Sequence, residues 1–202
     1  MKAVDRWLQQ WRIAKIRPYL APGARVLDIG CADGALARLV PGLDYLGIDP
    51  GLGASRTAPF GRLIKGCFPA DLPAGATEFD CITMLAVLEH IPLEAQASLA
   101  ADCFRFLRPG GLVLITVPSP AVDYVLAVLK GLRVIDGMSL EEHYGFDVRR
   151  VPECFAGASL EAVVHRRFQL GLNHLFVFRK PLISEPTDLE FSTDAAIPAL
   201  AS

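Results

Sequence analysis

A carboxylate follows a short apolar run near the start of the chain, immediately before a turn of small residues. Asp28 lies between Leu27 and Ile29, two positions before Gly30, and Gly34 closes the turn. Small residues after a buried strand let backbone N–H groups approach a ligand closely, as in nucleotide-binding α/β units. A site that only holds a pyrophosphate gains nothing from a negative charge here, whereas a cationic ligand would be attracted. The segment therefore predicts a site for a nucleotide-like ligand that carries positive charge.

A second carboxylate follows the next apolar run. Asp49 lies 21 positions after Asp28, close to the spacing at which an acid reaches the ribose of a nucleotide held at the first turn. A carboxylate can accept hydrogen bonds from both vicinal hydroxyls of the ribose. Each acid also has a purely structural interpretation, since Asp28 could cap the following helix and Asp49 could start the turn before Pro50. We expect both to bind the ligand.

The hydrophobic pattern predicts the elements that position these acids. We expect strands at 25–30, 45–48, 63–65, 79–85 and 112–117, helices at 33–40, 93–107, about 120–131 and 151–158, and loops at 51–61 and 132–150. Residues 3–19 predict an amphipathic helix with Trp7, Trp11, Ala14 and Ile16 on one face. The final runs, 162–170 and 174–179, are joined by three residues. A link this short favours an antiparallel hairpin, because parallel neighbours need a longer crossover.

Length and composition restrict the class of protein. The 202 residues are 52% hydrophobic with a net charge of −2, which suits one domain with a substantial core and does not predict a nucleic-acid binder. No apolar signal segment begins the chain, and prolines and Asp123 divide the apolar stretch 111–132, so we expect no membrane insertion. The five cysteines form no C-x-x-C pair, and we expect reduced thiols in a cytoplasmic protein. The expected division is an N-terminal helix at 1–20, one domain at 21–180 and a disordered tail at 181–202.

Four segments, in this order, resemble the motifs of class I S-adenosylmethionine-dependent methyltransferases. They are Val26–Gly34, Gly47–Asp49, Phe79–Ile91 and Leu107–Gly111. The third is similar to the small-molecule subgroup (methyltransferase type 11/12-like) that includes quinone-biosynthesis enzymes, and the terminal hairpin agrees with the family's reversed last strand. The resemblance implies a single-domain Rossmann-like α/β fold, with a seven-stranded, mostly parallel sheet. It also implies S-adenosyl-L-methionine as cofactor and a small-molecule methyl acceptor.

The resemblance also implies which residues bind the cofactor, with Asp28 near its amino-acid moiety and Asp49 at the ribose. The full expected set is Asp28, Gly30, Cys31, Gly34, Asp49, Pro50, Cys67, Phe68 and Leu85. Ala32 replaces the middle glycine of the family motif, and Cys67 stands where many relatives have an acid that reads adenine. Either Asp71 reaches back to the adenine or the Phe68 backbone and apolar walls contact it. We favour the second interpretation slightly.

Methyl transfer by in-line displacement depends mainly on positioning, and a hydroxyl or amine acceptor would benefit from a general base. The candidates are His90, at the end of the strand 79–85 region, and His143, in the variable stretch Glu141–Phe146. His90 has an architectural interpretation that we consider the stronger one. No spacing predicts a metal site. The apolar helix at 121–129 is either buried on the sheet or lines an apolar, lipid-like acceptor site with transient membrane contact. The acceptor and the oligomeric state are open.

Two other functions compete with methyl transfer. A nicotinamide-dependent oxidoreductase predicts a G-x-G-x-x-G turn, but this chain offers Gly30, Ala32 and Ala35 at those positions and Asp28 would have no role. A non-catalytic member of the methyltransferase fold is the stronger alternative, because Ala32, Cys67 and the region 51–61 depart from the family pattern and a fold does not guarantee activity.

Overall fold

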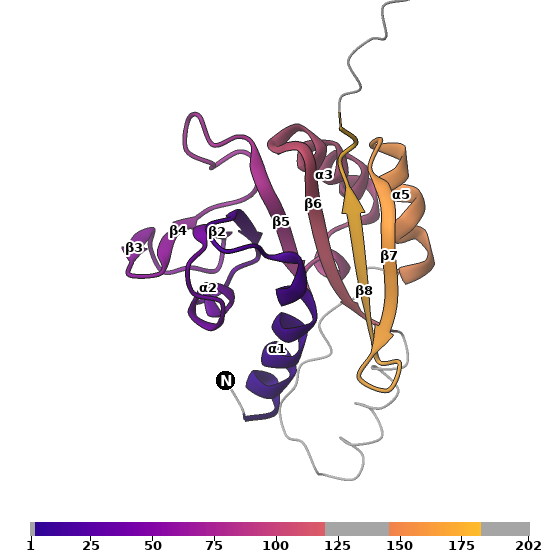
Figure 1. Ribbon diagram of the computed structural model, residues 1–202, viewed down its shortest axis with the longest axis horizontal. Helices are drawn as coiled ribbons and strands as arrows, with labels where there is room; N and C mark the ends of the chain where they lie inside the picture. The colour runs from indigo at the N-terminus through magenta and orange to yellow at the C-terminus, as the bar shows by residue number, and fades with distance from the viewer. Residues whose placement is uncertain (1–2, 120–145, 183–202) are drawn as a thin grey trace, which may run out of the picture.

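The computed structural model describes residues 3–119 and 146–182, which form one mixed sheet with helices on both faces (Figure 1). The helices are α1 (Ala3–Ile16), α2 (Ala35–Leu39), α3 (Leu93–Phe106) and α5 (Val151–Gly157). Short 3₁₀ turns occupy Arg17–Tyr19, Leu88–His90 and Val148–Arg150. The strands are β1 (Arg25–Ile29), β2 (Asp44–Asp49), β3 (Arg56–Ala58), β4 (Gly61–Lys65), β5 (Phe79–Leu85), β6 (Leu107–Pro118), β7 (Glu161–Phe168) and β8 (Asn173–Arg179).

The eight described strands follow the order β3-β4-β2-β1-β5-β6-β8-β7. The central strands from β4 to β6 are parallel, whereas β8 pairs antiparallel with both β6 and β7. The predicted α/β class with a mostly parallel sheet and a terminal hairpin is confirmed. The eighth strand is β3, which pairs antiparallel with β4 inside the stretch expected to be a loop. Its side chains are mostly exposed, so it leaves no hydrophobic pattern in the sequence.

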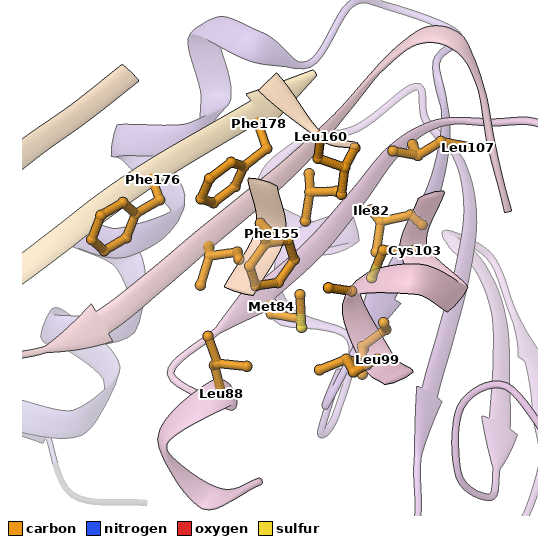
Figure 2. Close-up of a cluster of buried hydrophobic side chains, with 14 of the residues drawn as sticks. Ile82, Met84, Leu88, Leu99, Cys103, Leu107, Phe155, Leu160, Phe176 and Phe178 are labelled. Carbon is orange, nitrogen blue, oxygen red and sulfur yellow. The ribbon is translucent and has the colours of Figure 1, made fainter. Parts of the chain in front are cut away.

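Two hydrophobic clusters, one on each face of the sheet, make this a three-layer structure (Figure 1). One cluster joins the sheet to α3 and α5, and Figure 2 shows Phe155 of α5 packed there beside Phe178 of β8. Their rings stack with centroids 4.7 Å apart. The other cluster joins the sheet to α1 and α2 through residues such as Ile13 and Leu36. Strand β8 supplies buried side chains to both clusters.

The helix predicted at 3–19 exists, and its predicted face is confirmed in part, since Ile16 is buried and the partly buried Trp11 packs against the core. The α-helix ends at Ile16 and continues as a 3₁₀ turn, since Pro18 has no N–H to donate to the preceding turn. Ile13 and Ile16 are buried, whereas Trp7 is 55% exposed and Ala14 is also exposed. The sheet therefore takes the small branched side chains of α1 and leaves the larger Trp7 ring at the surface.

Other boundaries shifted for local reasons. The helix expected at 33–40 is the shorter α2, because Ala32 and Gly34 adopt positive φ angles of 46° and 78° and the helical conformation starts only after them. The strand expected at 112–117 is the longer β6, which begins at Leu107. Helix α3 and strand β5 lie where the hydrophobic pattern predicted them.

Some predictions lie outside the described residues. They are the helix at about 120–131, most of the loop at 132–150 and nearly all of the tail at 181–202. Within the described part of the chain, no helix has the length and apolar character needed to cross a membrane.

Candidate cofactor site

The loops that follow β1, β2 and β4 are tied together by hydrogen bonds at the carboxyl edge of the sheet. The Gly30 N–H donates to the Ile48 carbonyl at 2.9 Å, and the Gly66 N–H donates to the Asp49 carbonyl at 3.3 Å. The Ala32 N–H donates to Asp49 Oδ2 at 2.8 Å. Because all these loops leave the same edge of a parallel sheet, residues distant in sequence converge on one place.

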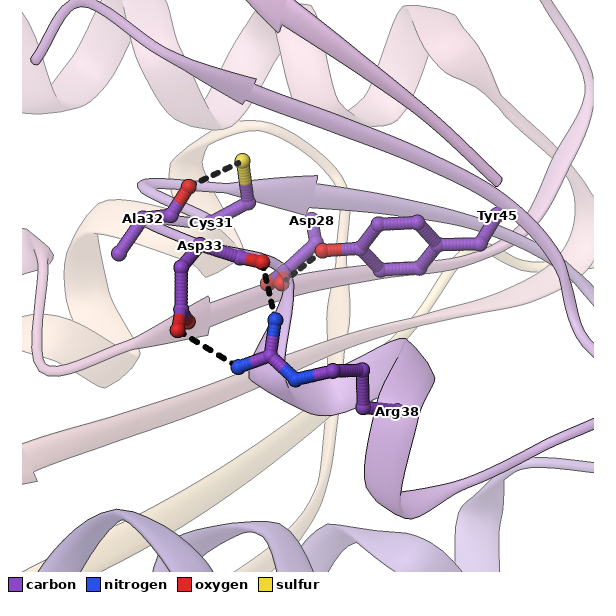
Figure 3. Close-up of polar contacts among 6 residues, drawn as sticks. All are labelled: Asp28, Cys31, Ala32, Asp33, Arg38 and Tyr45. Carbon is purple, nitrogen blue, oxygen red and sulfur yellow. Dashed lines mark hydrogen bonds and ion pairs between the residues drawn. The ribbon is translucent and has the colours of Figure 1, made fainter. Parts of the chain in front are cut away.

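Asp28 is the buried acid of this edge, with 4% of its surface exposed. The Thr83 hydroxyl donates to Asp28 Oδ1 at 2.6 Å. The Tyr45 hydroxyl donates to Oδ2 at 2.7 Å, a contact that Figure 3 shows. Burial raises the pKa of the Asp28 carboxyl from 3.8 to about 6, although the two hydroxyl hydrogen bonds oppose the rise. Asp28 is therefore a desolvated carboxylate held by neutral donors from both neighbouring strands.

Strand register explains this arrangement. Asp28 of β1 lies beside Thr83 of β5 and opposite Gly47 of β2. Tyr45 precedes Gly47 by two positions and so points to the same face of β2. A Cβ at position 47 would lie 2.7 Å from the Cys31 Sγ, so the glycine leaves the space that the Cys31 side chain fills. Burial raises the pKa of that thiol to about 12, and Cys31 is thus a neutral wall residue.

A pocket opens beside Asp28 under helix α1. Four of the predicted cofactor residues line it: Asp28, Gly30, Cys31 and Leu85. Helix α1 contributes Gln9, Arg12 and Ile13 to the same pocket, and α2 contributes Ala35 and Leu36. Sequence reasoning missed the α1 residues because the helix was treated as a separate N-terminal element. The pocket therefore has a basic residue, Arg12, and an acidic residue, Asp28, in the lining of one cavity.

The two predicted turn glycines are sterically required. Gly30 has φ +71°, and a Cβ there would lie 2.4 Å from Val87 Cγ2. Gly34 has φ +78°, and its Cβ would lie 2.7 Å from the Phe60 ring. The turn between them is closed by Arg38, whose guanidinium pairs with Asp33 at 2.6 Å (Figure 3).

Asp49 holds the neighbouring turn while keeping acceptor capacity. Its Oδ1 accepts from the Gly51 N–H at 2.7 Å and its Oδ2 from the Ala32 N–H. Asp49 therefore does form the turn before Gly51, as its structural interpretation predicted, but this role does not use all of its acceptor sites. A carboxylate has about four lone-pair sites, so two remain for the vicinal hydroxyls of a ribose. Pro50, next in the chain, is exposed.

The loop after β4 brings Asp71 back toward Cys67. The Cys67 N–H donates to Asp71 Oδ2 at 2.8 Å, so this acid lies beside the position where the family pattern expects one. Cys67 is exposed. The Phe68 ring meets Phe106 edge to face with centroids 5.4 Å apart. The structure thus supplies both a carboxylate and an aromatic wall at this loop.

The two histidine candidates differ in what the structure says of them. His90 is exposed at the end of the 3₁₀ turn after β5, and it is absent from the residues that line the pocket beside Asp28. His143 lies outside the described residues. In the ranges 3–119 and 146–182, no group of three or more His, Cys, Asp or Glu side chains could hold a metal ion.

The parallel sheet with its reversed terminal strand, together with acids at the carboxyl ends of β1 and β2, defines a Rossmann-like fold of the methyltransferase type. The family described as "Methyltransferase domain" matches residues 4–168, which is most of the chain. The chain belongs to this methyltransferase family.

Relatives and solved structures agree with that assignment. A probable S-adenosylmethionine-dependent methyltransferase of Mycolicibacterium smegmatis is 34% identical over 153 residues, covering 68% of this chain and 58% of its own. A ubiquinone biosynthesis O-methyltransferase of Psychrobacter arcticus is 32% identical over 130 residues, covering 56% and 50%. The chain thus spans about half the length of the curated relatives it matches. Magnesium protoporphyrin IX methyltransferase from Synechocystis, solved with bound SAH, shares the fold with a TM-score of 0.61 at 15% identity, over 89% and 88% of the two chains.

Proposed function

We propose that the protein is an S-adenosylmethionine-dependent methyltransferase that moves a methyl group to a small-molecule acceptor by in-line displacement. The observation that carries this proposal is the pocket lined by both the buried Asp28 and Arg12, next to the Asp49 turn. S-adenosylmethionine combines an α-amino acid with a ribose and an adenine, so it needs an anion, a cation and a ribose acceptor at one site. Family membership and the methyltransferase relatives support the same activity.

Each residue of the site would bind a different part of the cofactor. Asp28 would face the α-ammonium group and Arg12 the α-carboxylate, while the backbone of Gly30 and Cys31 lies along the amino-acid part. Asp49 would accept from the ribose hydroxyls. Asp71, held at Cys67 by a hydrogen bond, is better placed to accept from the adenine amino group than the sequence suggested, with Phe68 as an apolar wall. The bound cofactor supplies an electrophilic methyl group, and the protein supplies its position.

Calorimetry with S-adenosylmethionine, S-adenosylhomocysteine (SAH) and NAD tests the binding part of the proposal. We expect the first two to bind in the micromolar range and NAD not to bind. Asp49→Ala should weaken SAH binding by about 1–3 kcal/mol, because the ribose loses its charge-assisted hydrogen bonds. Asp44→Ala is the matched control, since Asp44 lies at the opposite end of β2 and is exposed. Unchanged affinity in Asp49→Ala would contradict the ribose assignment.

Chemical labelling gives a readout that needs no activity. Cys67 is the exposed thiol among the described cysteines, whereas Cys31, Cys81 and Cys103 are buried. If adenine binds against this loop, saturating SAH should slow alkylation of Cys67 by N-ethylmaleimide, as followed by peptide mass spectrometry. Labelling of the half-buried Cys154 should not change, because α5 directly precedes β7, which lies at the opposite end of the sheet from β4. Equal Cys67 rates with and without SAH would contradict the adenine position.

His90 and His143 remain our proposed candidates for a general base. If either acts as one, its Ala variant should lower kcat with a hydroxyl or amine acceptor while leaving the SAH Kd unchanged. A cytoplasmic location and a function without nucleic acid also remain expectations. Transient membrane contact rests on the apolar sequence 121–129, and the absence of flotation with liposomes, with or without anionic lipid, would refute it.

A non-catalytic role within the family is the second candidate. The observation that favours it is that both Asp28 oxygens already accept hydroxyl hydrogen bonds inside the protein. If the protein is a non-catalytic member of the family without a cofactor site, neither S-adenosylmethionine nor SAH binds at any pH.

A further inference from the structure

The Asp28 carboxylate is enclosed together with its two hydrogen-bond donors. Asp28, Tyr45 and Thr83 are 4%, 3% and 0% exposed. The donors come from different strands, β2 and β5, which flank β1 on its two sides. Their hydroxyls therefore fix both carboxylate oxygens, as two contacts from opposite sides leave the side chain little freedom to rotate.

The groups that face this carboxylate provide little charge compensation. Within the described part of the chain, Asp28 forms no ion pair. Asp49 at the end of β2 adds a second negative charge, which opposes ionisation of Asp28. The Cys31 thiol stays neutral, and Arg12 of α1 lies on the wall of the same pocket. A buried carboxylate in these surroundings gains most when a cation enters the pocket.

We propose that Tyr45, Asp28 and Thr83 act as one unit that couples cofactor binding to the release of a proton. Below about pH 6, Asp28 of the empty protein is mainly protonated. The α-ammonium group of the cofactor binds the ionised carboxylate, so the Asp28 O–H bond breaks, its proton passes to a water molecule or buffer base, and no bond of the cofactor changes. The proposal rests on the proposed function. Tyr45 and Thr83 are positioning residues, since they act on the cofactor only through Asp28.

The direction of the coupling follows from the hydrogen bonds. Both hydroxyls donate to the carboxylate, and a donor stabilises the ionised form more than the protonated form. Removing either donor therefore makes Asp28 harder to ionise and moves the pH dependence of cofactor binding to higher pH. A residue that only packs in the core would change affinity or stability without moving this dependence.

Calorimetric titration of SAH between pH 5 and 8, in two buffers of different ionisation enthalpy, tests the coupling in the wild type. We expect affinity to rise with pH by up to about tenfold per unit below pH 6 and to level off above it, since one proton is linked to binding. Proton release should approach one per ligand near pH 5 and fall toward zero near pH 8. Asp28→Asn should bind weakly with no such dependence, which also accounts for any titration of the ligand itself.

Variants of the donors provide the decisive comparison. Tyr45→Phe and Thr83→Val should each move the midpoint of the affinity profile upward by half a pH unit or more, whereas Thr83→Ser should restore the wild-type midpoint. Tyr19→Phe and Thr116→Val are matched controls, because Tyr19 lines a different pocket and the buried Thr116 hydroxyl has no hydrogen-bond partner among the described residues. Neither control should move the midpoint.

The outcomes separate this inference from the function on which it rests. If wild-type protein fails to bind SAH even at pH 8, the proposed function is wrong. If SAH binds but its affinity is independent of pH, or if Tyr45→Phe and Thr83→Val leave the midpoint unchanged, the coupling is wrong and the cofactor site stands.

Discussion

Replacing Asp28 with Asn should stabilise the cofactor-free protein, even though it weakens the cofactor site. The folded-state pKa of Asp28 is raised from 3.8 to about 6 by burial. A raised carboxyl pKa means that the folded state holds its proton more tightly than the unfolded state. The stability that comes from this protonation is present below the unfolded pKa and is lost as pH rises through the folded pKa. The wild type therefore becomes less stable between about pH 4 and pH 6.5 through this one group.

The size of the effect follows from the shift. A difference of about two pKa units corresponds to about 3 kcal/mol, at roughly 1.4 kcal/mol per unit. Asp28 is almost fully buried, so solvent screening reduces this value little. Asn has the same shape but does not ionise, so the variant does not lose stability through this group as pH rises. We expect the free energy of unfolding of Asp28→Asn, relative to the wild type, to increase by about this amount from pH 4 to pH 7.

Urea unfolding of both proteins at several pH values measures this difference. Subtracting the wild type from the variant removes contributions from groups that they share. One such group is Asp80, where burial raises the carboxyl pKa but the Arg25 and Arg108 contacts bring it below its usual value. A poor fit of the amide to the two hydroxyl donors would add an offset that does not vary with pH, so the slope is the informative quantity. A difference that stays flat from pH 4 to 7, or that falls, would refute the description of Asp28 as a buried, uncompensated acid.

The remaining predictions concern the turn, the core and the terminal hairpin. Gly30→Ala should lower the free energy of unfolding by about 1–3 kcal/mol, because alanine is strained in the left-handed backbone conformation at this position, and it should also lower SAH affinity. Adding Val87→Ala should recover part of the lost stability by removing the clash between the new Cβ and the Val87 side chain. If urea unfolding shows no recovery, the close approach of Val87 to Gly30 is contradicted. Phe155→Ala should lower the free energy of unfolding by about 3–5 kcal/mol, and a loss under 1 kcal/mol would mean that the core is not packed as described. His165 Nε2 and His174 Nδ1 lie 2.8 Å apart, and burial lowers both pKa values, so their contribution is present above the unfolded value of about 6.5 and is lost as pH falls. Hydrogen exchange should show the hairpin opening more readily at pH 5.5 than at 7.5 in the wild type, and this difference should be smaller in His165→Gln, which keeps only the His174 contribution.

The sequence predicted those parts of the fold that depend on local pattern. Strand β5 combines a strongly apolar run with clear ends, and the three-residue link before β8 restricts the hairpin geometry. Strand β3 could not be predicted because its pairing with β4 is a backbone interaction of exposed residues. The buried face of α1 was predicted in part. Ile16 is buried as expected, but the sheet also takes Ile13, whereas Trp7 is exposed despite its aromatic ring.

The sequence pointed to the site residues of the loop after β1, but not to those that reach the site only through the register between neighbouring strands. Asp28 and Gly30 meet Leu85 at one pocket as expected. Tyr45 and Thr83 lie 17 and 55 residues from Asp28, and only the alignment of β1 with its two neighbours brings their hydroxyls to it. Thr83 had a usable signal, since it is a polar residue inside an otherwise apolar strand. Arg12 had none, because nothing local indicates where an N-terminal helix will pack.

The position of β8 has a consequence for how the protein is made. This strand lies between β6 and β7, yet it is the last strand of the described sheet to leave the ribosome. It adds Phe176 and Phe178 to one cluster and Leu175 and Val177 to the other. Until residue 179 has been synthesised, β6 has an unpaired edge, and the hydrophobic clusters on both faces of the nascent sheet lack the side chains that β8 supplies. Such edges invite association between chains, so the time between synthesis of β6 and pairing of β8 is when nascent chains are most open to association.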